Sequence, residues 1–334
     1  MKGFFQYLAP FAPDYSGAVS VVFGMEALTV LCDPGGCSGN VCGYDEPRFY
    51  GSSNALFSAA IRDMDVIMGK DDLLARKVLF AASEKNYPFA ALIGTPVVSV
   101  VATDLNNLCH MVEKKTGIPA VSVDTNGMDF YDIGQSKMYL KLVKKFGALG
   151  EGNKSKSLVI GYTPLDMRGL AEAPNWESSV LLGWSADSLE ALKNLAEIKE
   201  SLVLSPSGLA AARELEKSFG IPYRAVFPES EPVNKILSSL PGNMGKTLIV
   251  HQQFAANALR EKLSAESDVG SWFMLDKEFA KEGDIRFDDE ELFIEKCMEY
   301  DTVICDEFYF KALKGFKGNK IAFNHFAVSG DLYE

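Results

Sequence analysis

The alternation of short apolar strands with amphipathic helices constrains the fold of this chain most. Apolar runs rich in β-branched residues recur along the sequence, and a loop and a helical pattern follow most of them. This alternation is typical of parallel sheets whose strands are joined by helical crossovers. We expect strands at residues 27–31, 89–93, 120–123, 157–161, 179–182, 202–204, 224–227, 247–250, 271–275, 302–305 and 320–323, and helices at residues 71–85, 103–116, 188–195, 207–219, 254–263 and 288–300.

Two breaks divide this alternating pattern into three parts. Residues 147–157 are rich in Gly, Ser and Lys directly before an apolar strand, and residues 240–246 form a second glycine-containing break. Gly-Ile-Pro occurs twice, each time between a helical pattern and a strand, which indicates repeated α/β modules. We therefore predict three successive Rossmann-like domains with parallel sheets, at residues 1–150, 151–240 and 241–334.

Charge and hydropathy argue against several kinds of partner. The 334-residue chain has a formal net charge of -12, which would repel a phosphate backbone, so we do not expect nucleic acid binding. No apolar run reaches the roughly 18–20 residues that a membrane-spanning helix needs. Pro10, Pro13 and Asp14 interrupt the N-terminal region where a signal peptide requires a continuous apolar core. We expect a protein that works in the cytoplasm, without a membrane partner.

Three of the six cysteines form the candidate functional loop. Cys32, Cys37 and Cys42 follow the first predicted strand and lie among several glycines. In a reducing compartment they remain thiols, and thiolates are the ligands of iron–sulfur clusters. Glycines let the backbone approach a bulky inorganic group closely. The loop therefore indicates a metal or cluster site, although a glycine-rich turn with inert, buried thiols would show the same pattern.

The CDPGGC run at residues 32–37 resembles the cluster-binding HGPxGC loop of the nitrogenase component 1 family. That family includes the nitrogenase MoFe subunits and light-independent protochlorophyllide reductase, and this chain is similar to its small, homodimer-sized members. In the resemblance Cys37 takes the position of the family cysteine, and Cys32 stands where histidine is usual. The likeness continues through residues 66–74, 92–96, 103–105, 117–123, 202–209, 219–222 and 324–330.

Departures from the family pattern limit what the resemblance implies. Thr95 occupies the position of a family cluster cysteine, and residues 11–13 hold no cysteine where a nitrogenase subunit has one. Ser205 stands where nitrogenase has the cysteine ligand of its iron–molybdenum cofactor, whereas His325 matches the histidine ligand of that cofactor. These differences argue against a complete eight-iron cluster and against dinitrogen reduction on such a cofactor.

The resemblance implies an oxidoreductase with a shared iron–sulfur cluster. Cys37 and Cys42 from each protomer of a homodimer would supply the four thiolates of one [4Fe-4S] cluster, with Cys32 as a third thiol in reserve. A nitrogenase-reductase-like ATPase, itself an iron–sulfur protein, would deliver electrons, and the cluster would pass them to a substrate. Two alternatives stay open: a scaffold or carrier for metal-cluster or cofactor assembly, and a substrate-binding module without a cluster.

Two polar residues at strand ends are candidates for substrate binding. Ser205 and His325 each follow a predicted strand, and open α/β sheets place their ligands at the carboxyl ends of strands. We expect both to line a substrate cavity, although a purely structural histidine would fit the same pattern. Asp306 and Glu307 would join them or cap a helix. The GNMGKT run at residues 242–247 is similar to the end of a phosphate-binding P-loop, but it precedes its strand and lacks the first glycine, which excludes that function.

Overall fold

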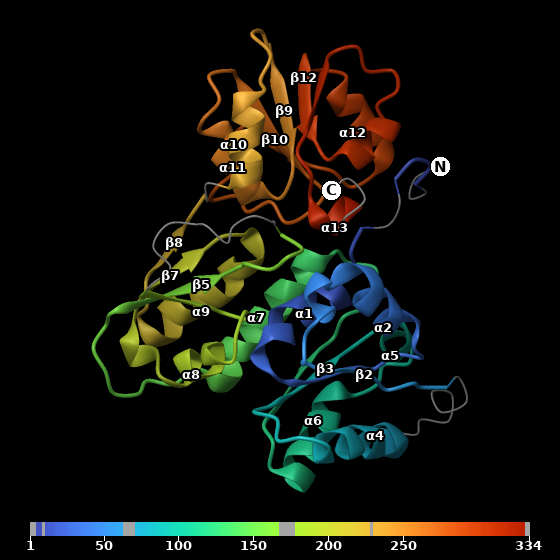
Figure 1. Ribbon diagram of the computed structural model, residues 1–334, viewed down its shortest axis with the longest axis vertical. Coiled ribbons are helices and arrows are strands. Elements are labelled where there is room, and N and C mark those ends of the chain that lie inside the picture. Colours follow the sequence, from blue (N-terminus) through green and yellow to red (C-terminus); the bar gives the residue numbers. More distant parts are fainter. Residues whose placement is uncertain (1–4, 9–10, 63–70, 167–177, 228–229, 331–334) are drawn as a thin grey trace.

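Three parallel sheets follow one another along the chain (Figure 1). The computed structural model describes residues 5–8, 11–62, 71–166, 178–227 and 230–330. Every strand pair in these sheets is parallel, which confirms the predicted fold class. Each sheet is built from strands of one predicted segment, whereas the independence of the three segments as domains stays a prediction. Across the described ranges, no helix combines the length and apolarity that a membrane span requires.

The first sheet is buried between two pairs of helices. Its strand order is β2 (Leu56–Ser58), β1 (Leu28–Leu31), β3 (Ala90–Ile93) and β4 (Ala120–Val123). Alternate residues face opposite sides: Ala90 and Leu92 pack against α4 (Asp71–Ser83) and α6 (Leu105–Thr116), whereas Ala91 and Ile93 pack against α1 (Asp14–Val22) and α7 (Tyr131–Phe146). Burial on both faces explains why β3 is a continuous apolar run and why β1 and β4 each contain a single, buried polar residue, Thr29 and Ser122.

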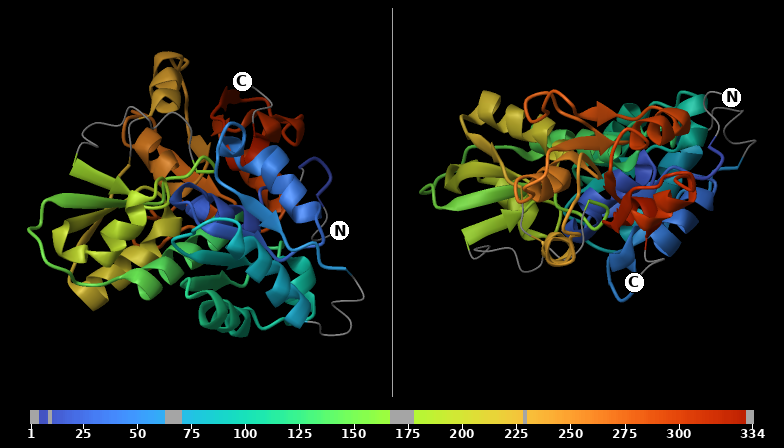
Figure 2. Two further views of the ribbon diagram at one scale, coloured as in Figure 1. Left: turned by 60° about the horizontal axis from the view of Figure 1, so that its bottom comes forward. Right: turned by 90° about the horizontal axis from the view of Figure 1, so that it is seen from above.

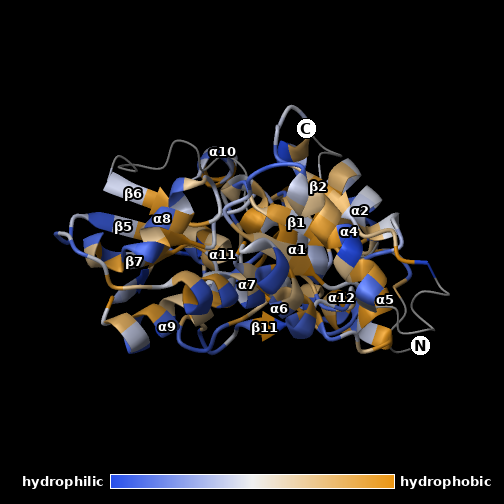
Figure 3. Cartoon of the chain, turned by 90° about the horizontal axis from the view of Figure 1, so that it is seen from below, coloured by the Kyte–Doolittle hydropathy of each residue, from blue (hydrophilic) through white to orange (hydrophobic). Residues whose placement is uncertain are grey.

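The second and third sheets repeat this layered arrangement (Figure 2). Figure 3 shows apolar residues gathered in the strands and on the inner helix faces, with polar residues toward the outside. The second sheet has the order β6 (Ser179–Leu181), β5 (Lys156–Ile160), β7 (Ile198–Val203) and β8 (Tyr223–Ala225), with α8 (Asp187–Lys193) and α9 (Leu209–Phe219). The third has the order β11 (Ile285–Arg286), β10 (Ser267–Ser271), β9 (Thr247–Val250), β12 (Thr302–Cys305) and β13 (Asn319–Ala322), with α10 (Glu231–Ser238), α11 (Gln253–Arg260), α12 (Glu290–Cys297) and α13 (Phe326–Ser329).

One predicted strand is displaced along the chain. The sequence analysis predicts a strand at residues 271–275, a run that contains Trp272 and Phe273. The strand is instead β10, which ends at Ser271. Both aromatic side chains leave the sheet and are buried in an aromatic cluster of the third sheet's core, so their apolar character reflects packing and not strand pairing.

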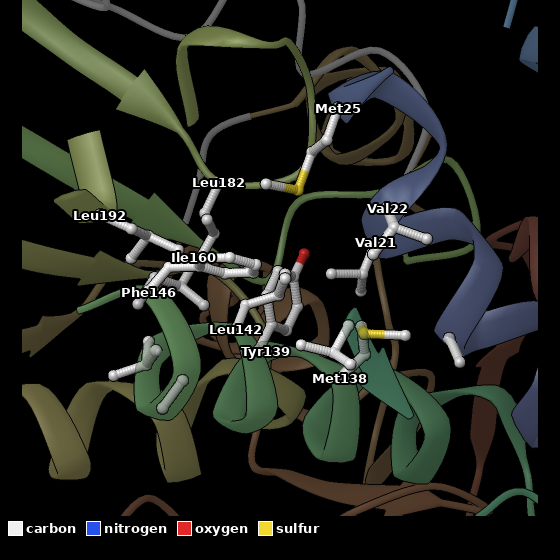
Figure 4. Close-up of a cluster of buried hydrophobic side chains, with 14 of the residues drawn as sticks. Val21, Val22, Met25, Met138, Tyr139, Leu142, Phe146, Ile160, Leu182 and Leu192 are labelled. Carbon is white, nitrogen blue, oxygen red and sulfur yellow. The ribbon is translucent and has the colours of Figure 1, made fainter. Parts of the chain in front are cut away.

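Helices α1 and α7 cross at very short range because each carries a glycine at the contact. A Cβ atom on Gly17 would lie 1.8 Å from the Tyr131 carbonyl oxygen, and one on Gly134 would lie 1.7 Å from the Asp14 carbonyl oxygen. Beyond this crossing, α7 presents apolar side chains to α1 and to the second sheet together (Figure 4). Helix α7 therefore packs against both the first and the second sheet. Its close crossing with α1 sets the position of its N-terminal residues.

The N-terminal arm, residues 5–8, is attached to the third sheet and not to the first. The backbone N–H groups of residues 6–8 donate to the Glu290 carboxylate over distances of 2.6 to 3.1 Å. Phe11, which follows the arm, packs with Trp272 and Tyr309 at ring-centroid distances of 5.5 and 5.9 Å. Residues 5–8 and Phe11 thus complete the core of the third sheet.

Candidate functional site

Cys32 is the first residue after β1, and its environment is that of a core residue. Its N–H donates to the Ile93 carbonyl over 2.9 Å, and its side chain is fully buried in the apolar core beneath α4 and α6. Burial raises the pKa of the Cys32 thiol to about 12. Thr95, in the position of the missing family cysteine, is also buried and donates its hydroxyl to the Cys32 carbonyl over 2.7 Å.

Cys37 and Cys42 lie on adjacent turns at the surface of the same loop. Cys37 belongs to the short helix α2 (Gly36–Asn40), and Cys42 to the π-helical turn Val41–Asp45 that follows it. Both side chains are half-buried, and both are free thiols. The loop is open on its outer side, since an added Cβ would meet no atom within 4 Å at any of four glycines: Gly35, Gly36, Gly39 and Gly43.

Asp33 and Tyr15 have opposite effects on the pKa of the Cys37 thiol. The buried Asp33 carboxylate accepts hydrogen bonds from the Ser38 N–H at 2.8 Å and from the Ser58 hydroxyl at 2.5 Å. Burial, with a smaller contribution from this carboxylate, raises the pKa of Cys37, while the Tyr15 hydroxyl hydrogen bond lowers it. Burial and Asp33 also raise the pKa of Cys42. Both thiols therefore hold their protons tightly, and a bound metal would have to displace those protons.

Polar contacts to α1 hold the loop in place. Asp45 accepts hydrogen bonds from the Ser16 hydroxyl at 2.6 Å and from the Asn40 amide at 2.5 Å. Burial raises the pKa of Asp45 to about 6. The Arg48 guanidinium donates to the Ser20 carbonyl at 2.6 Å and forms an ion pair with Glu46. These bonds orient both half-buried cysteines relative to α1.

The two half-buried thiols of the loop are half the number of ligands that an iron–sulfur cluster needs. In the part of the chain that the structure describes, no three His, Cys, Asp or Glu side chains lie close enough together to hold a metal ion. One copy thus offers Cys37 and Cys42, whereas a [4Fe-4S] cluster takes four thiolates. A second copy of the same open loop would complete such a set.

A second group of polar residues meets where the three sheets adjoin. We call Tyr131, Gln135, Thr163, Asp166 and His325 the interdomain cluster. Tyr131 and Gln135 lie on the first turns of α7, Thr163 and Asp166 follow β5, and His325 follows β13. All five side chains are buried, and a chain of hydrogen bonds joins them.

Asp166 is the centre of the interdomain cluster. Its carboxylate accepts hydrogen bonds from the Gln135 amide at 3.0 Å, the Thr163 hydroxyl at 3.0 Å and the Tyr131 hydroxyl at 3.3 Å. Burial raises the pKa of Asp166 to about 7, although hydrogen bonds from Gln135, Thr163 and Ser205 oppose this effect. The carboxyl group can therefore bind and release a proton near neutral pH.

His325 is held on three sides. Its Nε2 atom lies 3.0 Å from the Tyr131 hydroxyl, and its backbone N–H donates to Asp306 over 2.7 Å. The ring stacks on His251 with a centroid distance of 4.2 Å and an interplanar angle of 18°. Burial lowers the pKa of both histidines, to about 4 for His251 and well below the ordinary value for His325. Both rings are consequently neutral at neutral pH.

The structure brings the two predicted substrate residues to the same place. Ser205 hydrogen-bonds to Asp166, and its hydroxyl lies 2.6 Å from the Ser207 hydroxyl. Ser205 and His325 are each only 1% exposed, so side chains of the cluster surround both. Asp306 caps the turn that follows β12, accepting from the Phe308 N–H at 2.8 Å. A role for these residues in substrate binding stays a prediction.

Sequence reasoning missed several members of this site. Tyr131 and Gln135 lie on a helix that was not predicted, and Asp166 lies in a loop without a recognisable motif. His251 directly follows β9, so the strand-end argument that selected His325 would also have selected it. Residues 66–70, the first part of one segment of the family resemblance, lie outside the described residues.

Comparison with known proteins agrees with this fold. A family model described as nitrogenase component 1 type oxidoreductase matches residues 13–240. The structure "Nitrogenase Cp1 at pH 6.5" is 14% identical, with a TM-score of 0.71 over 97% of this chain and 87% of that chain. The structure "Nitrogenase Cp1 at pH 5" is also 14% identical, with a TM-score of 0.67 over 97% and 85% of the two chains. A search of curated proteins gave no match. The chain belongs to the nitrogenase component 1 type oxidoreductase family.

Proposed function

We propose that this chain is the catalytic component of a nitrogenase-like oxidoreductase, working in the cytoplasm as a homodimer with an iron–sulfur cluster between its copies. The observation that carries the proposal is the pair of half-buried thiols, Cys37 and Cys42. They lie on an open loop of a chain that belongs to this family. Their exposure favours these two as ligands over the fully buried Cys32. When bound, a [4Fe-4S] cluster would supply one-electron redox chemistry.

The residues around the loop would adjust the site. The Tyr15 hydroxyl donates a hydrogen bond to the Cys37 sulfur, which stabilises a thiolate and favours the reduced state of a bound centre. The Asp33 carboxylate has the opposite effect, because its negative charge repels added electrons. Ser16, Asn40 and Asp45 keep the loop against α1, so the thiols have defined positions when two copies meet.

The interdomain cluster would be the place of substrate reduction. Ser205 and His325 would contact the substrate, and Asp166 would bind and release a proton near neutral pH. The Tyr131 hydroxyl connects Asp166 to the neutral His325 ring and would hold the two groups in position beside the substrate. Electrons would come from an ATP-dependent iron–sulfur reductase of the nitrogenase-reductase type.

Anaerobic purification tests the ligand assignment directly. We expect the wild-type protein to contain iron and sulfide and to give an EPR signal after reduction. Cys37→Ala and Cys42→Ala should lose that signal, whereas Cys109→Ala, which changes a buried thiol on α6, should keep it as the matched control. Cys32→Ala shows whether the third thiol is a ligand: loss of the EPR signal would mean that it is, and an unchanged signal that it is not. An unchanged cluster in Cys37→Ala would show that the assignment is wrong.

The alternative function is a scaffold or carrier that hands on a metal cluster or cofactor. The open outer side of the loop favours this possibility, because an exposed cluster could be released to an acceptor. Mixing the reduced protein with a reductase of the nitrogenase-reductase type separates the two. ATP-dependent electron uptake supports the oxidoreductase, and transfer of iron to an apoprotein without electron uptake supports the carrier.

A further inference from the structure

A groove runs along the free edge of the first sheet, on the side away from β2. Strand β4 is the last strand of this sheet among those the structure describes, and α6 and α7 form the two walls. The groove has a volume of about 440 Å³, which is the size of a small-molecule site. Cys109, Val121 and Leu140 contribute apolar surface to it. Neither candidate site described above includes these residues.

One wall of this groove is a row of lysines on α7. Lys137, Lys141, Lys144 and Lys145 recur at helical spacing, so they share one face of the helix. The Lys137 ammonium donates to the backbone carbonyl of Asp124 at 2.8 Å. Lys145 forms an ion pair with a carboxylate of the opposite wall. Two of the four ammonium groups are therefore engaged within the chain.

Lys141 and Lys144 are the unpaired members of the row. Both side chains are exposed, and neither has a hydrogen bond or ion pair within the described residues. The lining contains four lysines but only two carboxylates, those of Glu113 and Asp124. The groove is thus positive by two charges, in a chain whose formal net charge is -12.

The position of these charges favours an anionic ligand. Like charges one turn apart on a helix repel each other, and a bound anion would relieve that repulsion. A concave site with apolar walls also concentrates the electric field of its charges. Ammonium groups act as point charges that suit phosphate groups, while the apolar part of the surface suits an organic body.

We propose that this groove binds a small organic dianion of the phosphate-monoester class, with its charge at Lys141 and Lys144 and its organic part over Leu140 and Val121. The site is distinct from the cysteine loop and from the interdomain cluster, so it does not depend on the function proposed above.

Titration with phenyl phosphate, which combines a dianion with an apolar ring, tests this proposal. We expect saturable binding to the wild type by calorimetry, and binding about 10-fold weaker or more in Lys141→Ala/Lys144→Ala. The control, Lys217→Ala/Lys235→Ala, removes the same charge from exposed positions outside the groove and should bind as the wild type does. Equal weakening in both double variants, or no saturable binding at about 10 mM, would overturn the proposal.

A second measurement uses only the wild type. Lysine acetylation followed by mass spectrometry should show that phenyl phosphate protects Lys141 and Lys144 but not Lys217 or Lys235. Equal labelling of all four residues with and without the ligand would contradict the assigned site. This test does not depend on the folding of any variant.

Discussion

Asp166 makes the stability of the fold depend on pH in a calculable way. Its pKa rises from 3.8 to about 7 on folding, chiefly because the side chain is buried. A raised carboxyl pKa means that the folded state prefers the protonated form, so stability is full below about pH 4 and is lost as the pH rises through 7. A shift of about three pKa units corresponds to about 4 kcal/mol of unfolding free energy. Asp166→Asn should abolish this contribution, because the amide stays neutral.

Urea denaturation at a series of pH values measures the effect. The unfolding free energy of Asp166→Asn, relative to the wild type, should increase by about 4 kcal/mol between pH 4 and pH 8. Asp187→Asn, which changes an exposed carboxylate at the start of α8, is the matched control and should show no such change. If the difference between Asp166→Asn and the wild type is the same at every pH, the reasoning from burial is wrong.

Three further variants test the packing and the polar contacts. Gly134→Ala should lower the unfolding free energy by about 1–3 kcal/mol or more in urea titrations, because the new methyl group overlaps α1, whereas Gly39→Ala at the open loop should change it little. Tyr131→Phe removes a buried hydroxyl that joins two members of the interdomain cluster, so we expect a loss of about 1–3 kcal/mol in the same assay; an unchanged value would mean that these hydrogen bonds contribute nothing. Glu290→Ala removes the acceptor of three backbone N–H groups, so limited proteolysis should cut residues 6–8 faster than in the wild type, and equal rates would contradict the attachment of the arm.

The central strands could be predicted from the sequence for a physical reason. A parallel strand covered on both faces consists almost entirely of apolar residues, as in β3, β9 and β12, and glycine-rich or polar loops mark its ends. The edge strands β2 and β11, of three and two residues, were not predicted, although β6 and β8, also of three residues, were. Such short pairings carry little sequence signal of their own.

The candidate site was only partly accessible from the sequence. The cysteine loop and the strand-end residues Ser205 and His325 could be selected, because local order along the chain decides where a strand ends. Tyr131 and Asp166 could not be selected, since they meet only after α7 crosses α1 at Gly17. A contact between helices that are distant in sequence has no local sequence pattern, so the meeting of Tyr131 and Asp166 could not be predicted.

The attachment of residues 6–8 to Glu290 limits when this part of the chain can fold during synthesis. Residues 6–8 leave the ribosome long before their acceptor, Glu290, because at least 282 residues of sequence separate them. Phe11 can contact Trp272 and Tyr309 only once those two residues have also been made. Residues 6–8 can therefore dock only after Glu290 has been made, and removing residues 5–11 would expose aromatic side chains of the third sheet's core to solvent.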